Sequence, residues 1–129
     1  STMTIDRSID VEEAIRASLG DYMQVYVKPL PKTFEVPSVE ITAVGGSEMD
    51  KIDRFDVTLD SRAEVEAEAL ENLRNAIGII KKVAMSQTTA LRVVTVNSLG
   101  SWGKDPVRPD LAMYSARLRV IAHVETVEV

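Results

Sequence analysis

Cysteine is absent from the 129-residue sequence, and histidine occurs once, as His123. Without cysteine the chain forms no disulfide and no thiolate metal site, and its compartment stays undetermined. A single histidine makes a histidine-rich metal centre or a histidine-based catalytic triad hard to assemble. Aromatic residues make up 5% of the chain and include one tryptophan, Trp102. These absences argue against several classes of metalloprotein and hydrolase.

Long apolar runs and an excess of positive charge are also missing. No stretch approaches the roughly 20 apolar residues of a membrane span. Residues 1–20 are polar and mixed, unlike a signal peptide, so we expect no membrane partner. The net charge of −5 argues against tightly bound nucleic acid, because phosphate binding requires clustered Lys and Arg. Nucleic acid could still pass close to the chain without binding to it.

The remaining composition is ordinary for a soluble globular protein, with 45% hydrophobic and 27% charged residues. The chain shows no internal repeat and no sign of a second domain. We therefore expect one domain over residues 1–129, which is long enough to bury roughly two thirds of its unfolded surface.

The clearest pattern is a strand followed by a long helix. Apolar and polar residues alternate over Arg54–Asp60, which predicts a strand with one buried face. Ser61 and Glu64 then have the spacing of a capping box, which predicts the start of a helix. The end of this helix stays open between Gly78 and Val83, because glycine weakens a helix interior. Apolar residues recur along one stripe of the helix at three- and four-residue steps: Ala63, Ala67, Leu70, Leu73, Ile77, Ile80 and Ala84.

A shorter helix is predicted near the N-terminus. Asp10 and Glu13 have capping spacing, and an apolar stripe follows over Val11–Leu19. Gly20 is a suitable stop for this helix. We expect residues 1–7 to form a loose terminus.

Strands and connections separate the two helices. Alternation predicts strands at Tyr22–Lys28 and Val39–Ala43. Pro29–Pro37 holds three prolines, which favours an extended connection or sheet edge, because proline lacks the amide that a ladder needs. Gly45–Gly46 suits a turn, with a polar loop following at Ser47–Asp53.

Two further strands follow the long helix. Leu91–Leu99 is rich in β-branched residues, and Gly100–Asp110 reads as a connection that contains Trp102. Strict alternation from Ala112 to Glu125 predicts a strand with one apolar and one polar face. The order helix, three strands, helix, two strands predicts an α+β fold: a mostly antiparallel or mixed five-stranded sheet with both helices packed on one face.

Candidate catalytic and metal sites are weak. Glu48, Asp50 and Asp53 offer oxygens to a hard cation, but they lack the alternating ligands and glycine of a calcium loop, so a solvated acidic loop is favoured. Asp56 and Asp60 share the polar face of one strand, with no sign of a pocket around them. We expect no metal, no cofactor and no catalytic residues, which favours an interaction protein over an enzyme.

Several exposed side chains are candidates for contacts with partners. Trp102, between two glycines in its long connection, suits an anchor at a protein interface, and it suits equally well a side chain folded back over the sheet edge. Arg117 and Arg119 share the polar face of the last strand, where they either pair with acids of a neighbour or stay exposed. The full set of candidate interface residues is Met49, Lys51, Arg54, Trp102, Lys104, Arg108, Arg117 and Arg119.

The order of elements is accompanied by short motifs. They are V-Y-V-K-P-L-P (Val25–Pro31), P-S-V-E-I (Pro37–Ile41) running into Gly45–Gly46, a strand leading into an Ala- and Glu-rich helix (from Arg54), and a Pro-containing loop (Pro106–Pro109) before a final strand with Tyr114 and Arg117. Together, over roughly residues 8–125, they resemble the tail terminator proteins of long-tailed bacteriophages, also called tail completion or minor tail proteins. The Trp102 connection and the acidic 47–53 loop have no counterpart in this resemblance.

The resemblance implies a structural virion protein without enzymatic activity. Such a subunit forms a hexameric ring that caps the head-proximal end of the tail tube, stops its polymerisation and offers a surface to the head–tail connector. The implied partners are further copies of the chain, the major tail tube protein and the connector, while DNA passes through the lumen without specific binding. The implied location is the virion tail, and the host cytoplasm during assembly. Residues 45–54 and 99–110 would then contact tube, connector or neighbour, and Arg117 and Arg119 would face a neighbour or the lumen.

Two other hypotheses stay open. A head–tail joining protein on the connector side of the same virion has a similar size and architecture. A small α+β enzyme acting on an anionic metabolite through Arg54, Arg117 and Arg119 would require a concave pocket around these arginines.

Overall fold

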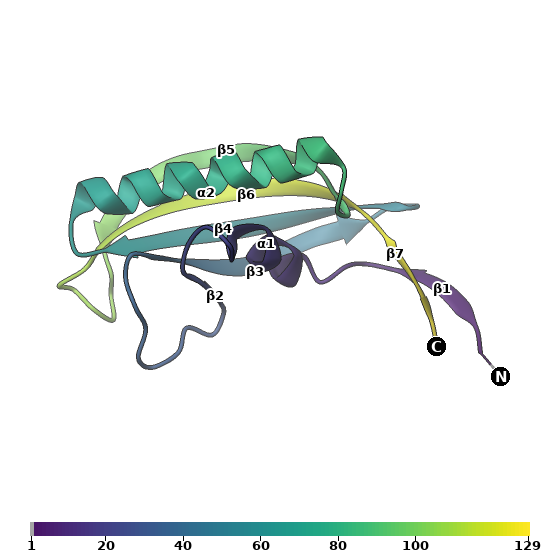
Figure 1. Cartoon of the computed structure of the whole chain (residues 1–129), viewed down its shortest axis with the longest axis horizontal. Helices are drawn as coiled ribbons and strands as arrows, with labels where there is room; N and C mark the ends of the chain where they lie inside the picture. Colours follow the sequence, from purple (N-terminus) through teal and green to yellow (C-terminus); the bar gives the residue numbers. More distant parts are fainter. Residues whose placement is uncertain (1) are drawn as a thin grey trace.

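A long helix lies across one face of a five-stranded sheet in the computed structural model, which describes residues 2–129 and all their side chains except that of Ser101 (Figure 1). The sheet has the strand order β2-β3-β4-β6-β5, with β2 and β3 parallel and all other pairs antiparallel. The helices are α1 (Val11–Leu19) and α2 (Glu66–Ser86). The strands are β1 (Thr4–Arg7), β2 (Val25–Val27), β3 (Ser38–Glu48), β4 (Ile52–Ala63), β5 (Leu91–Lys104), β6 (Ala112–His123) and β7 (Glu125–Glu128). The α+β prediction is confirmed.

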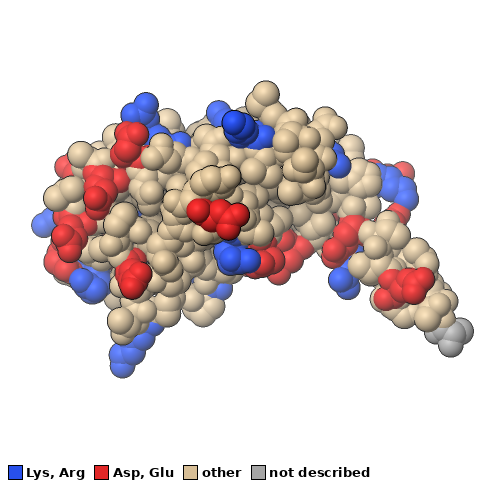
Figure 2. Space-filling view, in the orientation of Figure 1, with Lys and Arg blue, Asp and Glu red and all other residues tan. Residues whose placement is uncertain are grey.

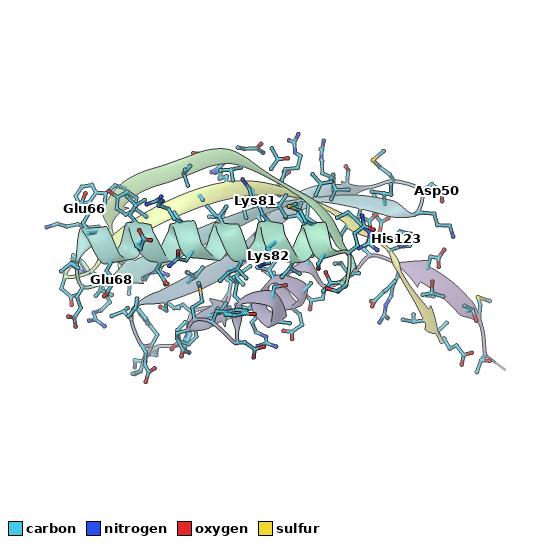
Figure 3. All side chains as sticks on the ribbon, turned by 45° about the horizontal axis from the view of Figure 1, so that its top comes forward. Asp50, Glu66, Glu68, Lys81, Lys82 and His123 are labelled. Atoms are coloured by element: carbon cyan, nitrogen blue, oxygen red, sulfur yellow. The ribbon has the colours of Figure 1, made fainter. Side chains whose placement is uncertain are left out.

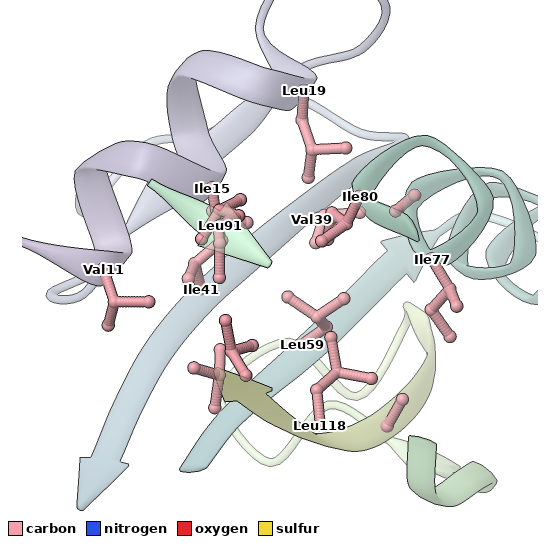
Figure 4. Packing of buried hydrophobic residues seen from close by; sticks show 14 of the residues in the cluster. Val11, Ile15, Leu19, Val39, Ile41, Leu59, Ile77, Ile80, Leu91 and Leu118 are labelled. Carbon is pink, nitrogen blue, oxygen red and sulfur yellow. The ribbon is translucent and has the colours of Figure 1, made fainter. Parts of the chain in front are cut away.

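One hydrophobic core lies between the helices and the sheet (Figure 4). The alternation predicted for β4 and β6 places Leu59 and Leu118 on the covered face, where both are almost fully buried. Ile15 of α1 and Leu73 and Ile80 of α2 pack into the same cluster and are 0% exposed. Each such side chain stabilises the fold by about 1.5–3 kcal/mol. Both helices therefore cover the same face of the sheet, as predicted.

The two helix starts differ from one another. Asp10 caps α1, and its carboxylate accepts a bond of 3.1 Å from the Glu13 amide, which confirms the predicted cap. The predicted capping box of α2 is wrong, because the helix begins after Val65 without a side-chain cap. Ser61 lies in β4, and its hydroxyl donates to the Ala69 carbonyl at 2.7 Å. The serine thus links β4 to the first turn of α2 by a hydrogen bond.

The end of α2 is settled by packing. The helix continues through Gly78 and past Val83 to Ser86. Ile77 and Ile80 are buried on either side of the glycine, and their burial outweighs the roughly 1 kcal/mol that glycine costs in a helix. Neither helix in the described part of the chain is both long and apolar enough to cross a membrane.

The β3–β4 hairpin is longer than predicted, and the predicted turn at Gly45–Gly46 is wrong. Both glycines lie in β3, which bulges after Ala43 and continues to Glu48, so most of the predicted 47–53 loop is strand. A side chain at Gly46 would place its Cβ atom 2.1 Å from the Arg54 carbonyl oxygen of β4. The glycine is needed for the close approach of two strands and not for a turn. The first predicted strand, by contrast, shortens from Tyr22–Lys28 to β2.

The predicted long connection that contains Trp102 is also wrong. The tryptophan lies in β5 opposite Tyr114, not in a long connection, because β5 pairs with β6 along its whole length through three irregularities in register. The connection is reduced to Asp105–Leu111. Pairing with a long neighbour therefore overrides the two glycines that had suggested a loop.

Residues Thr4–Arg7 form strand β1, so the prediction of a loose terminus is wrong. β1 pairs antiparallel with β7 in a separate two-stranded sheet, called here the terminal ribbon. The ribbon projects from the body and carries both chain termini (Figure 1). Its two strands are about 120 residues apart in the sequence, a separation that local periodicity does not report.

Candidate interaction surfaces

The structure distributes the candidate residues over three places. Met49, Lys51 and Arg54 lie at one end of the sheet, near the tip of the β3–β4 hairpin. Trp102, Lys104 and Arg108 lie at or beyond the C-terminal end of β5, at the opposite end. Arg117 and Arg119 lie in between on β6. The candidate residues therefore lie in three separate places and do not form one site.

The hairpin end, defined as residues 44–54, exposes apolar side chains. Val44 is 58% exposed, Met49 64% and Ile52 43%. The 49–51 turn that closes the hairpin holds Lys51 at a positive φ of 64°. Exposed apolar groups gathered at one tip are typical of a surface that meets another protein.

Polar contacts join the hairpin end to the terminal ribbon. Lys51 forms an ion pair with Asp6 of β1, and Ser8 donates to Glu48 at 2.7 Å. The bond from Lys51, assisted by one from Thr126, lowers the pKa of Asp6. The same Asp6 carboxylate raises the pKa of Lys51. Both partners are exposed, so the contact orients the ribbon more than it stabilises the fold.

Below the hairpin end lies a small cavity of 180 Å³ lined in part by Ser8, Gly46 and Phe55. Two buried polar atoms beside it, Asp53 Oδ2 and Arg54 Nε, have no hydrogen-bond partner in the structure. Unsatisfied buried groups of this kind cost about 1–3 kcal/mol each. Within residues 2–129, no three side chains of the metal-ligating types gather to hold an ion.

The face of the sheet turned away from the helices, called here the open face, carries both β6 arginines. Arg117 and Arg119 are exposed, and Arg119 lies 3.6 Å from the Asp56 carboxylate of β4. They line a shallow groove of 420 Å³ together with Val44 and Asn97. Arg54 does not line this groove, so the three arginines of the enzyme hypothesis are not brought together.

A buried ionic network, absent from the sequence predictions, lies at the other end of the open face. Arg62 is almost fully buried and bonds to Glu40 at 2.9 Å and to Asp105 at 2.6 Å. Burial acts to lower the pKa of Arg62, but the bonds to Glu40 and Asp105 prevail and raise it. Phe34 stacks under the Arg62 guanidinium at 5.8 Å. The network fixes the Asp105–Leu111 connection and the proline-rich connection beneath the sheet.

Arg108 is part of the same arrangement. Its guanidinium lies 5.8 Å from the centre of the Phe34 ring, and it pairs with Asp110 at 2.9 Å. The hydrogen bonds that Arg108 donates to Asp110 raise the pKa of Arg108 and lower the pKa of Asp110. Arg108 therefore already has partners within the chain. The polar-face positions of Glu40 and Arg62 on adjacent strands were the signal that could have revealed this network.

Trp102 is half exposed at the end of β5. It pairs across the ladder with Tyr114, so both side chains lie on the helix side of the sheet. The Tyr114 hydroxyl donates to Glu66, the first residue of α2, at 2.9 Å, and this bond raises the pKa of the tyrosine. Lys104 is exposed two residues further on. The tryptophan thus stands on a paired strand with about half of its surface free.

The sequence patterns gave no sign of a hollow between α2 and the turn that follows α1. Tyr22, Ile79 and Lys82 line it, and it has a volume of 440 Å³. Asn72 borders it and leaves Nδ2 buried without a partner. Tyr22 is 70% exposed at its rim.

Charge does not gather into one large patch. Figure 2 shows acidic and basic side chains interspersed over the visible face, with no extended basic area. Acidic residues Glu66 and Glu68 mark the first turn of α2, and Lys81 and Lys82 lie toward its other end (Figure 3). The visible face therefore lacks the clustered cations that hold a nucleic acid backbone.

Comparison with known proteins adds no assignment. No family model matches the chain, and no curated protein sequence matches it. The function must therefore be argued from the surfaces described above and from the motifs of the sequence.

Proposed function

We propose that the chain is a tail terminator subunit of a long-tailed bacteriophage. In this proposal, copies of the chain form a hexameric ring that caps the head-proximal end of the tail tube and receives the head–tail connector. The proposal starts from the resemblance in the order of elements and motifs. The observation that carries it further is the placement of residues 45–54 and 99–110 at opposite ends of the sheet.

A ring held between two partners needs one contact surface for each. The hairpin end supplies exposed Val44, Met49 and Ile52 at one end of the sheet. Trp102 and Val107, 51% and 79% exposed, lie toward the other end. We assign one of these ends to the tube protein and the other to the connector.

A closed ring also needs two unlike patches, because each subunit contacts its neighbours through different surfaces. The open face, with Arg117 and Arg119, supplies one candidate patch for a neighbour or for the lumen. The net charge of −5 is compatible with a lumen through which DNA slides, because an acidic protein does not grip the phosphate backbone.

The direct test is assembly. Light scattering of the chain, alone and mixed with its major tail tube protein, should reveal a six-chain ring that caps the tube. Met49→Asp should abolish binding of one partner, the tube protein or the connector, and spare the other, whereas the matched variant Val107→Asp should show the reverse pattern. A chain that stays monomeric at high concentration and with tube protein would overturn the proposal. If the protein is found on DNA-filled heads and not on finished tails, the head–tail joining role replaces it.

A second candidate function is binding of a small anion, and the open-face groove with Arg117 and Arg119 favours it. Inorganic phosphate and a panel of anionic metabolites should then raise the melting temperature of the protein. The double variant Arg117→Gln, Arg119→Gln should lose the rise, while Arg74→Gln on α2 should keep it. No rise with any compound would discard this function.

A further inference from the structure

The terminal ribbon lacks the support that a two-stranded sheet normally needs. Isolated ribbons of this size are marginal in water, and stability usually requires a third strand or a packed helix. Here both outer edges of β1 and β7 are unpaired in the described chain. Met3 and Val129, paired through two backbone bonds at the free end, are 64% and 61% exposed.

A long free strand edge exists elsewhere in the molecule. β5 is fourteen residues long and outermost in the main sheet, with β6 on one side and no strand on the other. Val93, in its first half, is 51% exposed. Such an edge presents a row of unpaired amide and carbonyl groups that can accept another strand.

The two elements have opposite charge. The ribbon strands carry three acids and one base; Glu125 pairs with Arg7 and Asp6 with Lys51, and Glu128 has no ion pair among the described residues. β5 contains no acid; Arg92 lies near its start and Lys104 at its far end. Lys81 adds a further positive charge on the β5 side of α2 (Figure 3). Complementary charges of this kind select a partner and its orientation.

The ribbon is directed away from the β5 edge of its own chain. One residue, Val124, separates β6 from β7, and its amide donates to the Lys51 carbonyl at 3.1 Å. This bond and the Lys51–Asp6 ion pair hold the ribbon on the β4 side of β6, whereas β5 lies on the other side. The start of β5 is level with the end of β6, since Leu91 pairs with Ala122. The ribbon and the start of β5 therefore lie at the same end of the molecule but on opposite flanks.

We propose that the terminal ribbon is an arm that adds to the Leu91–Asn97 edge of β5 in a second copy of this chain. The inference rests on the proposed function in one respect, since it identifies the second copy with the neighbour in the ring. Opposite flanks at one level suit a ring, because rotation about its axis brings the arm of one copy to the edge of the next without a change in height. Ladder hydrogen bonds provide the affinity, and the charges set the register.

The absence of cysteine makes a clean test possible. Thr4→Cys places one thiol on the arm, and Val93→Cys, Thr95→Cys and Asn97→Cys each place one on β5. Thr33→Cys, in the exposed proline-rich connection, is the matched control. Each β5 variant is mixed with the arm variant and treated with a short bifunctional maleimide reagent. Cross-linked pairs should form several-fold more with at least one β5 variant than with the control, and equal yields throughout would overturn the inference.

Charge reversal gives an independent readout. Arg92→Glu in the β5 variant should lower the cross-linking yield, and Glu128→Lys in the arm variant should restore it. An unchanged yield in Arg92→Glu, or a lowered yield that Glu128→Lys does not restore, would contradict the assigned charges. Light scattering of the same mixtures separates the two proposals. Six-chain rings without arm-to-β5 cross-links would overturn the proposal that the ribbon adds to β5. Cross-linked pairs that form no ring and bind no tube protein would overturn the tail terminator function and support the addition of the ribbon to β5.

Discussion

The helix-covered part of the sheet and the end formed by the terminal ribbon and the hairpin tip are held together by different forces. In the first, Leu59, Leu73 and Ile80 are fully buried between two layers. In the second, the links to the body include the Lys51–Asp6 ion pair and the Ser8–Glu48 hydrogen bond, both at exposed side chains. Apolar burial fixes a scaffold, whereas exposed polar links orient a segment that is still free to bind.

The contrast also predicts unequal local stability. Opening of the ribbon exposes little apolar surface, while opening of β4 or β6 exposes the core. A segment with a low free energy of local opening can adjust to a partner, and binding then orders it. Substitutions in the helix-covered sheet should therefore cost far more stability than substitutions in the ribbon or at the hairpin tip.

Leu59→Ala should lower the free energy of unfolding by about 2–5 kcal/mol, because it leaves a cavity under both helices. Val127→Ala, the matched truncation in the ribbon, should lower it by less than about 0.5 kcal/mol. Urea denaturation of both variants provides the measurement. Similar losses in the two variants would show that the ribbon belongs to the same cooperative unit as the core.

Arg62→Ala should lower the free energy of unfolding by about 3 kcal/mol, because the buried Glu40 and Asp105 carboxylates lose their cation. Arg119→Ala removes an exposed partner of Asp56 and should have little effect. Thermal unfolding of the two variants compares a buried with an open-face arginine. An unchanged melting temperature for Arg62→Ala would refute a structural role for the network.

Gly46→Ala should disturb the hairpin end and leave the core folded, because the new Cβ atom would lie 2.1 Å from the Arg54 carbonyl. Gly78→Ala has no atom within 4 Å of the new methyl group and should stabilise α2 by about 0.5–1 kcal/mol. Amide hydrogen exchange of β3 and β4 near the tip, and urea denaturation, measure the two effects. Unaltered exchange at the tip of Gly46→Ala would contradict the close approach.

Acid should loosen the ribbon before it unfolds the core. The bonds from Lys51 and Thr126 lower the pKa of Asp6, so their contribution is present above the ordinary value of 3.8 and is lost as the pH falls through the lower folded value. Hydrogen exchange of the ribbon amides, followed from neutral pH to about pH 3 and corrected for intrinsic rates, should show this loss. Asp6→Asn should remove the pH dependence of the ribbon. A ribbon whose protection is the same in both proteins at every pH would rule out this role for the carboxylate.

Prediction from the sequence worked best where periodicity and burial agree. The apolar stripes of α1 and α2 and the alternation of β4 and β6 identified the core and the side of the sheet that the helices cover. It failed where pairing with another strand overrides a local turn or loop signal. Gly46, Trp102 and the residues of β1 each gave a loop or turn signal, yet each lies in a strand that pairs with a segment elsewhere in the chain.

The candidate interface residues show the same limit. Met49 is exposed at the tip of a hairpin, and the two β6 arginines are exposed on the polar face of their strand. The sequence indicates both kinds of position. The contact of Arg108 with Phe34 depends on how two connections fold beneath the sheet, and the absence of Arg54 from the groove depends on where the sheet places its side chain. Side-chain partners of this kind are set by three-dimensional proximity, and no local pattern encodes them.

The α+β class, the covered face of the sheet and the long helix that covers it follow from the residue pattern, because burial of apolar side chains imposes periods of two and about 3.6 on the chain. The pairing of the termini into a ribbon, the extension of the hairpin through its glycines and the contact of Arg62 with two acids below the sheet emerge only in the folded molecule. The ribbon and the Arg62 network join residues far apart in sequence, and the hairpin depends on strand pairing across its turn; the free energy of these contacts appears only once the chain has folded.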